Sequence, residues 1–198
     1  MKRIIQIMSV IFCILLSVGG LILAETESNT DVIERIGVKG PLEFNKTVFE
    51  LAWSDKPDDT YYAQEYLPTG ENLETFNQML AIHLFVKDIT AKSAALNKAT
   101  ELAIKMGKNG LVYLKGNADE KTFVLDFTVT EKKLVEYNLY RYQDIDIDGK
   151  KGLLVYMYCK RGYGKDIKPF LKTLKEVSAD LQNEMFSTEI PVVTIENK

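Results

Sequence analysis

The chain has 198 residues, of which 46% are hydrophobic and 10% aromatic, so we expect a single folded domain with a sizeable core rather than a disordered chain. Its 25 basic and 28 acidic residues give a formal net charge of −3. Residues 25–198 keep 23 of the basic residues and every acidic one, so their net charge is −5. This mild acidity argues against binding to nucleic acid, which requires a basic surface.

Residues 1–24 have the order of segments that is typical of an export signal peptide. Lys2 and Arg3 precede a largely apolar run over residues 4–23, and Ala24 offers a small residue for cleavage before a polar stretch. A run of about 20 apolar residues is also long enough to span a bilayer, so a retained N-terminal anchor is the alternative. We therefore expect a periplasmic or secreted protein, attached to the membrane only if this segment remains uncleaved.

One of the two cysteines lies in residues 1–24 and the other in the rest of the chain. Cys13 lies inside the apolar run, so cleavage leaves Cys159 as the single cysteine of the mature chain. No internal disulfide can then form, and the stability of the domain must come from its hydrophobic core.

The first half of the remaining chain is predicted to begin with a linker and to continue into strands. Residues 25–40 are expected to be a linker containing an edge strand at 32–38, and residues 41–198 a single domain. Alternating residues predict strands over 47–53 and 60–67, joined by a polar turn. Beyond Pro68 and Gly70, Asn72 is expected to cap a short helix that ends near residue 80. A strand over 81–86 follows, with a helical continuation as the alternative.

The second half is predicted to be a helix, a run of strands and a closing helix. Helical spacing of apolar residues predicts one helix over 91–108 and a second over 166–185. Between them we expect strands at 111–115, 122–130, 133–145 and 152–160, with Asp148–Gly149 as a tight turn. The tail is expected to add a short strand at 191–195. Together these elements predict an α+β fold, in which two amphipathic helices cover a mainly antiparallel sheet.

The order of these elements, and the sequence EYLPTGENLETF at residues 65–76 leading into a strand, resemble the DcrB, PsbP and Mog1 group. The resemblance covers residues 42–185 and lies in topology rather than in a motif. That group consists of small α/β/α sandwiches, several of which are exported, and it shares no catalytic motif. The resemblance therefore implies a binding or accessory protein and assigns no functional residue.

One acidic cluster imitates the start of a calcium-binding loop. Asp144, Asp146 and Asp148 alternate and precede Gly149, as in loops that gather carboxylate oxygens around a cation. The twelfth position of such a loop requires glutamate and here is Val155. The same pattern is typical of a β-hairpin turn, which we prefer, and no metal site is predicted.

Candidates for catalysis are few. His83 is the only histidine, and a packed strand histidine is the preferred interpretation over a metal ligand or a base. Cys159 alternates with Leu153, Val155 and Met157, which predicts a buried thiol. The segment KRGYGK at 160–165 misses the spacing of a phosphate-binding P-loop and is expected to lead flexibly into the last helix. For a hydrolase, the best candidates are Glu50 and Glu65 near His83.

Tyrosines are the most promising binding residues. If several of them met on one exposed face of the sheet, they would form a surface for a protein or a ligand; packing in the core is the plainer alternative. The residues considered for this surface are Tyr61, Tyr62, Tyr66, Tyr140, Tyr142 and Tyr163.

These observations predict an exported, non-enzymatic envelope protein that acts as a protein- or ligand-binding or accessory module. Its expected partner is another envelope or secreted protein, and no catalytic residue or cofactor is predicted. An immunity or inhibitor protein that neutralises a secreted toxin is one alternative. A small hydrolase that uses carboxylate and histidine chemistry is the other.

Overall fold

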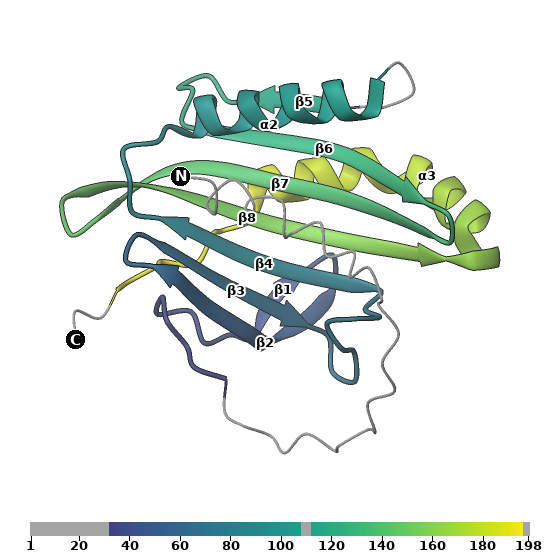
Figure 1. Cartoon of the computed structure of the whole chain (residues 1–198), viewed down its shortest axis with the longest axis horizontal. Helices are drawn as coiled ribbons and strands as arrows, with labels where there is room; N and C mark the ends of the chain where they lie inside the picture. The colour runs from purple at the N-terminus through teal and green to yellow at the C-terminus, as the bar shows by residue number, and fades with distance from the viewer. Residues whose placement is uncertain (1–31, 108–111, 196–198) are drawn as a thin grey trace. The chain divides into compact units, whose positions relative to one another are not determined.

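A computed structural model describes residues 32–107 and 112–195, and one antiparallel sheet organises this part of the chain (Figure 1). The predicted α+β class, with a mainly antiparallel sheet and two helices, is confirmed. The strands are β1 (Leu42–Phe44), β2 (Thr47–Asp58), β3 (Tyr61–Leu67), β4 (Gln78–Phe85), β5 (Val112–Gly116), β6 (Thr122–Glu131), β7 (Leu134–Ile147) and β8 (Lys150–Tyr163). The helices are α2 (Ala91–Met106) and α3 (Ile167–Ser187), and a short 3-10 turn, η2 (Gly164–Asp166), leads into α3.

The sheet joins two runs of consecutive strands. Its order is β1-β2-β3-β4-β8-β7-β6-β5, and all neighbouring strands are antiparallel. The second run is the four-stranded meander that the sequence predicts. β8 turns back from β7 and pairs on its other side with β4. β4 and β8 therefore lie next to each other at the centre of the sheet (Figure 1).

The main hydrophobic core lies on the face of the sheet that α3 covers, here called the α3 face. Leu174, Leu181 and Met185 of α3 are buried against it. A Cβ atom on Gly162 would stand 2.7 Å from the Phe170 ring, so glycine permits the close approach of α3 to β8. Sheet residues of this core include Tyr62, Tyr66, Leu80, Ile82, Leu84, Val124, Tyr137, Leu139, Leu154, Tyr156 and Tyr158.

The opposite side of the sheet, here called the α2 face, carries the alternate residues of the same strands. α2 lies along β5, β6 and β7, and it begins at Thr90, whose hydroxyl accepts a hydrogen bond from the Ser93 amide. The Ala91 amide donates to Asp144 Oδ1, which attaches the start of the helix to β7. The central strands β7 and β8 contain long runs of buried residues, where a sheet with one solvated face would alternate.

Several predicted elements differ from the structure at the margins of the domain. No strand forms over 32–38 or 191–195, although the Thr194 amide donates to the Ile36 carbonyl at 2.8 Å and joins the two segments. β2 runs on through Pro57 to Asp58, with irregular pairing to β3 after Asp55. The proposed signal peptide and residues 25–31 lie outside the described residues.

The predicted short helix over 72–80 is wrong, and the reason is strand pairing. Gln78, Met79 and Leu80 begin β4, which pairs with β3 on one side and β8 on the other. Hydrogen bonds to two neighbouring strands outweigh the local helical spacing of four apolar residues. Asn72 still caps, but it caps a turn: its Oδ1 accepts from the amides of Glu74 and Thr75.

Candidate binding site: the Arg161 network and the 68–77 loop

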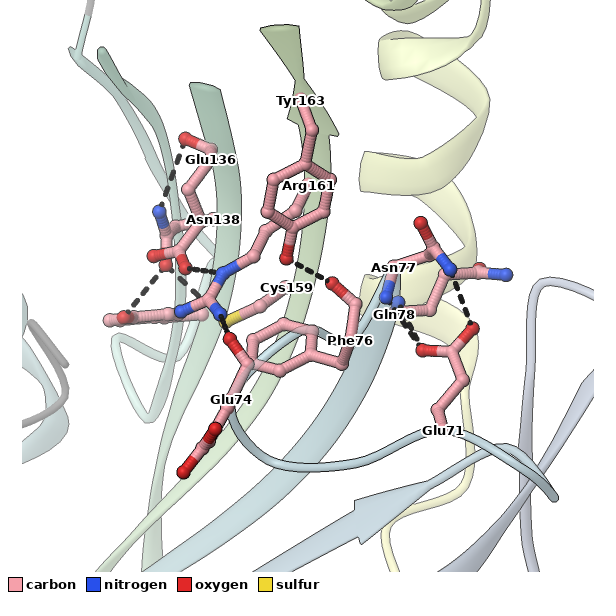
Figure 2. A network of polar contacts seen from close by, with 11 residues as sticks. Glu71, Glu74, Phe76, Asn77, Gln78, Glu136, Asn138, Cys159, Arg161 and Tyr163 are labelled. Atoms are coloured by element: carbon pink, nitrogen blue, oxygen red, sulfur yellow. Dashed lines mark hydrogen bonds and ion pairs between the residues drawn. The ribbon is translucent and has the colours of Figure 1, made fainter. Parts of the chain in front are cut away.

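The described domain contains a polar network on the α2 face, where β7 and β8 approach the loop between β3 and β4 (Figure 2). β8 places Cys159, Arg161 and Tyr163 on this face, and β7 places Glu136 and Asn138 beside them through the pairs Glu136–Arg161 and Asn138–Cys159. We call these five side chains the Arg161 network. The loop is residues 68–77, between the end of β3 and the start of β4.

An ion pair forms the centre of the Arg161 network. Arg161 Nε donates to Glu136 Oε2 at 2.7 Å, and the two side chains are only 6% and 12% exposed. The guanidinium also lies 3.7 Å from the centre of the Phe76 ring, a cation–π contact. Desolvation alone would lower the pKa of Arg161, but the charge and the hydrogen bond of Glu136 raise it above its ordinary value. Arg161 therefore keeps its positive charge, and its guanidinium lies against Phe76.

The backbone of the 68–77 loop is attached to β8 at successive positions. The Tyr163 hydroxyl donates to the Phe76 carbonyl at 2.7 Å, and the Arg161 amide donates to the Asn77 carbonyl at 2.9 Å. Arg161 also reaches the Glu74 carbonyl with Nη1, at 3.4 Å. Figure 2 shows these contacts converging on the loop from one side. The end of the loop thus has a defined backbone conformation.

Within the loop, side chains complete the turn. Glu71 Oε2 accepts hydrogen bonds from the amides of Asn77 and Gln78, at 2.6 and 3.1 Å. Gly70 adopts a φ of 84°, a left-handed conformation that costs glycine little, and the Glu71 amide closes the turn onto the Pro68 carbonyl. The outward side chains, among them Thr69 and Glu74, remain exposed. The result is a preformed, mildly acidic projection from the end of β3.

Below the ion pair, the network is buried and chemically inert. The Cys159 thiol and the Tyr140 hydroxyl both donate to Asn138 Oδ1, at 3.3 and 3.0 Å. Burial raises the pKa of the thiol and of the hydroxyl well above their ordinary values. Cys159 is therefore protonated at neutral pH and unsuited to nucleophilic attack, in agreement with the prediction of a buried thiol.

His83 lies further along the same face. It is buried, its Nδ1 shares a 2.7 Å hydrogen bond with the Tyr61 hydroxyl, and its Nε2 has no partner among the described residues. Desolvation lowers the pKa of His83 to about 3, so the ring is neutral at physiological pH. Glu65 pairs with Ala81 and His83 with Ala63, which makes Glu65 and His83 diagonal neighbours. No hydrogen bond joins them among the described residues, and Glu50 is exposed on β2.

Glu65 is a carboxyl group in an apolar environment. Desolvation raises its pKa from 4.5 to about 7, and the positive charge of Arg161 opposes this only in part. The folded chain therefore binds a proton at Glu65 more readily than the unfolded chain does. The contribution of Glu65 to stability therefore falls as the pH rises from about 4.5 to 7, and it changes little above pH 7.

Replacing Glu65 with glutamine should remove this dependence on pH. Relative to the unaltered chain, Glu65→Gln should be about 2–3 kcal/mol more stable at pH 8 than at pH 5, because the amide never ionises. Urea denaturation of both proteins at the two pH values measures the difference, and His83 contributes equally to both. Glu50→Gln, at an exposed position, serves as the control. If the difference in unfolding free energy between the two proteins were the same at pH 5 and pH 8, Glu65 would be ionised at both pH values.

The six tyrosines considered for a binding surface do not share one face. Tyr61, Tyr140, Tyr142 and Tyr163 belong to the α2 face, whereas Tyr62 and Tyr66 belong to the core under α3. All except Tyr163 are less than 9% exposed. The structure thus brings Tyr61 to His83, Tyr140 to Asn138 and Tyr163 to the 68–77 loop, and it packs the six mainly inside the domain.

The aspartate-rich segment 144–149 and the KRGYGK segment at 160–165 both have structural roles. Asp148 and Gly149 both have positive φ angles and form the two-residue turn between β7 and β8, so the predicted hairpin is confirmed. Asp146 Oδ1 accepts from the Gly149 amide, and Asp144 binds the start of α2. In KRGYGK, Arg161 and Tyr163 belong to the Arg161 network and Gly164 begins η2.

The sequence reasoning missed Glu136, Asn138 and Arg161. The signal was present in the alternation of the predicted strands. Arg161 continues the buried series Leu153, Val155, Met157 and Cys159, and such a position can hold a charge only if an opposite charge neutralises it. Glu136 is the acid at the matching position of the neighbouring strand.

A comparison with protein-family models gives one broad match, which covers residues 36–190 and therefore most of the described domain. The chain belongs to this family. The matched range includes β1 to β8, α2, α3 and the whole Arg161 network. The family match assigns no activity, ligand or partner to the chain.

A search among curated proteins finds no match. Over the described ranges 32–107 and 112–195, no helix combines the length and the apolarity needed to cross a membrane.

Proposed function

We propose that the chain is an exported, non-enzymatic binding module of the cell envelope and that the 68–77 loop is the element that contacts its partner. The single observation that carries this proposal is the way the loop is held. A buried ion pair, an aromatic contact and hydrogen bonds from β8 fix its backbone, while Thr69 and Glu74 project into solvent. A preformed loop loses little conformational entropy on binding, which favours recognition.

The chemistry of the α2 face supports binding rather than catalysis. The Cys159 thiol is protonated, and among the described residues no hydrogen bond links it to His83, as a nucleophile and its base would require. The hydrolase alternative would have to use Glu65, whose carboxyl group has no hydrogen-bonded partner in the described residues. An immunity protein would use the same binding mode, with a toxin as the partner.

The proposal also covers location and fold type. The order of residues 1–24 supports export, and the partner is then an envelope or secreted protein. The packing of α2 and α3 on different faces of the sheet supports an α/β/α-sandwich arrangement like that of the DcrB, PsbP and Mog1 group. Intact mass of the exported protein tests the first point, since a chain that still begins at Met1 has an anchor instead of a cleaved signal.

Affinity capture from envelope extract tests the role of the loop. Thr69→Ala/Glu74→Ala removes two exposed side chains that make no hydrogen bond within the part of the chain that the structure describes. Thr130→Ala/Glu131→Ala removes the same pair of residue types at the exposed end of β6. We expect a protein that the unaltered chain and the β6 variant retain equally and that the loop variant retains about tenfold less, as for interface hot spots. Equal capture by all three chains would contradict the proposal.

A further inference from the structure

A pocket of about 260 Å³ lies between the edge strand β1 and the C-terminal tail, away from the 68–77 loop. One wall is the start of β1, with Leu42 and Glu43, and the opposite wall is the tail, with Glu189 and Ile190. Tyr156 of β8 also lines the pocket, and the remaining lining residues are Pro41, Pro191 and Val192.

The tail that forms one wall is held by Arg141. Its Nη1 atom donates to the carbonyls of Met185, Phe186 and Thr188, at 3.1, 3.1 and 2.8 Å, where α3 ends. The last carbonyls of a helix carry partial negative charge, so the guanidinium stabilises this end. Further along, the Thr194 amide bonds to the Ile36 carbonyl. The wall is therefore attached on both sides of the pocket.

Tyr156 supplies an unused polar group inside this pocket. The residue is only 1% exposed, yet no hydrogen bond to its hydroxyl occurs within the described residues. Burial raises the pKa of Tyr156 above its ordinary value, with the negative charge of Glu184 adding to this and Arg141 opposing it, so the phenol remains neutral. The hydroxyl is therefore free to accept a hydrogen bond from a donor that enters the pocket.

The charges that line the pocket have one sign. Glu43 and Glu189 are exposed and make no ion pair within the described residues, and no basic side chain lines the pocket. The charge of Arg141 is directed at the carbonyls of α3, and Glu184 lies near enough to Tyr156 to influence it. Leu42, Ile190 and the two prolines supply an apolar lining.

We propose that this pocket binds an ammonium or guanidinium group carried on an apolar stem. Glu43 and Glu189 neutralise the cation at the rim, the tyrosine hydroxyl accepts one of its hydrogen bonds, and the aliphatic side chains pack against the stem. A lysine or arginine side chain of a partner protein and a small alkylamine both have this chemistry. The site is separate from the 68–77 loop, and the proposal does not depend on that loop's role.

A nuclear magnetic resonance titration of the exported chain with butylammonium chloride tests the site. We expect saturable shifts at Leu42, Tyr156 and Ile190, and no such shifts with sodium butyrate, which has an apolar stem and the opposite charge. Glu43→Gln/Glu189→Gln should weaken binding about fivefold or more, because two partly exposed carboxylates are lost. Glu50→Gln/Glu131→Gln, which removes two exposed acids elsewhere, should leave the dissociation constant unchanged.

Tyr156→Phe keeps the ring and removes the hydroxyl, and it should weaken binding about two- to fivefold. A capped Gly-Lys-Gly peptide distinguishes the two sources of the cation. If it binds at least about fivefold more tightly than butylammonium, the natural ligand is a protein side chain, and if it binds equally or more weakly, the ligand is a small amine. Equal responses to butylammonium and butyrate, or equal weakening in both double variants, would overturn the proposal.

Discussion

Replacing Arg161 with methionine should lower the free energy of unfolding by about 3–5 kcal/mol, the usual cost of leaving a buried charge without its partner. Glu136 is only 12% exposed and would lose the 2.7 Å hydrogen bond from Arg161 Nε. The same change removes the cation that lies against the Phe76 ring. Urea denaturation measures the loss of stability, and hydrogen exchange of the 68–77 amides should show that the loop opens more readily.

A double variant and a surface pair provide the controls. Arg161→Met/Glu136→Leu removes both charges and should recover most of the lost stability, since apolar residues of similar volume can replace a buried ion pair. Lys151→Met breaks a pair whose side chains are 76% and 72% exposed and should cost no more than about 1 kcal/mol. If Arg161→Met cost no more than Lys151→Met, the buried ion pair would not hold the network together.

Leu174→Ala should destabilise the domain by about 2–5 kcal/mol. Leu174 is 8% exposed and packs from α3 into the main core, so its removal leaves a cavity between the helix and the sheet. The neighbouring Lys175 is exposed, and Lys175→Ala should change stability by no more than about 0.5 kcal/mol. Thermal or denaturant melts of the two variants compare them directly. Near-equal midpoints would mean that α3 does not depend on this packing in solution.

The elements that could be predicted from the sequence are those with a strong local pattern. α3 has apolar residues at helical spacing over five turns, and the β7–β8 hairpin has an Asp-Gly turn between two long strands. These signals depend only on neighbouring residues. For α2 the helix itself is confirmed, but Leu96 is 46% exposed, whereas Ala91, Ala95 and Leu102 are buried.

The rest required knowledge of which strands become neighbours. The start of β4 has helical spacing, and its pairing with β8, about 80 residues later, decides its conformation. The candidate site was missed for the same reason. Glu136 and Arg161 are 25 residues apart in sequence, and only the register of β7 and β8 makes them partners. The tyrosines were visible in the sequence, but their division between two faces depends on the whole sheet.

The two outer strands of the sheet limit how another polypeptide can join it. β1 has three residues and follows Pro41, and β5 has five residues, one of them Lys115. A short edge with a proline or a lysine beside it is a poor template for an added strand, which protects the domain from ordered aggregation with its own copies. The same edges disfavour the most general mode of peptide capture, in which a guest chain extends a sheet through backbone hydrogen bonds. A domain that binds a partner as we propose would then rely on side chains, and its binding would be selective for the sequence of the partner.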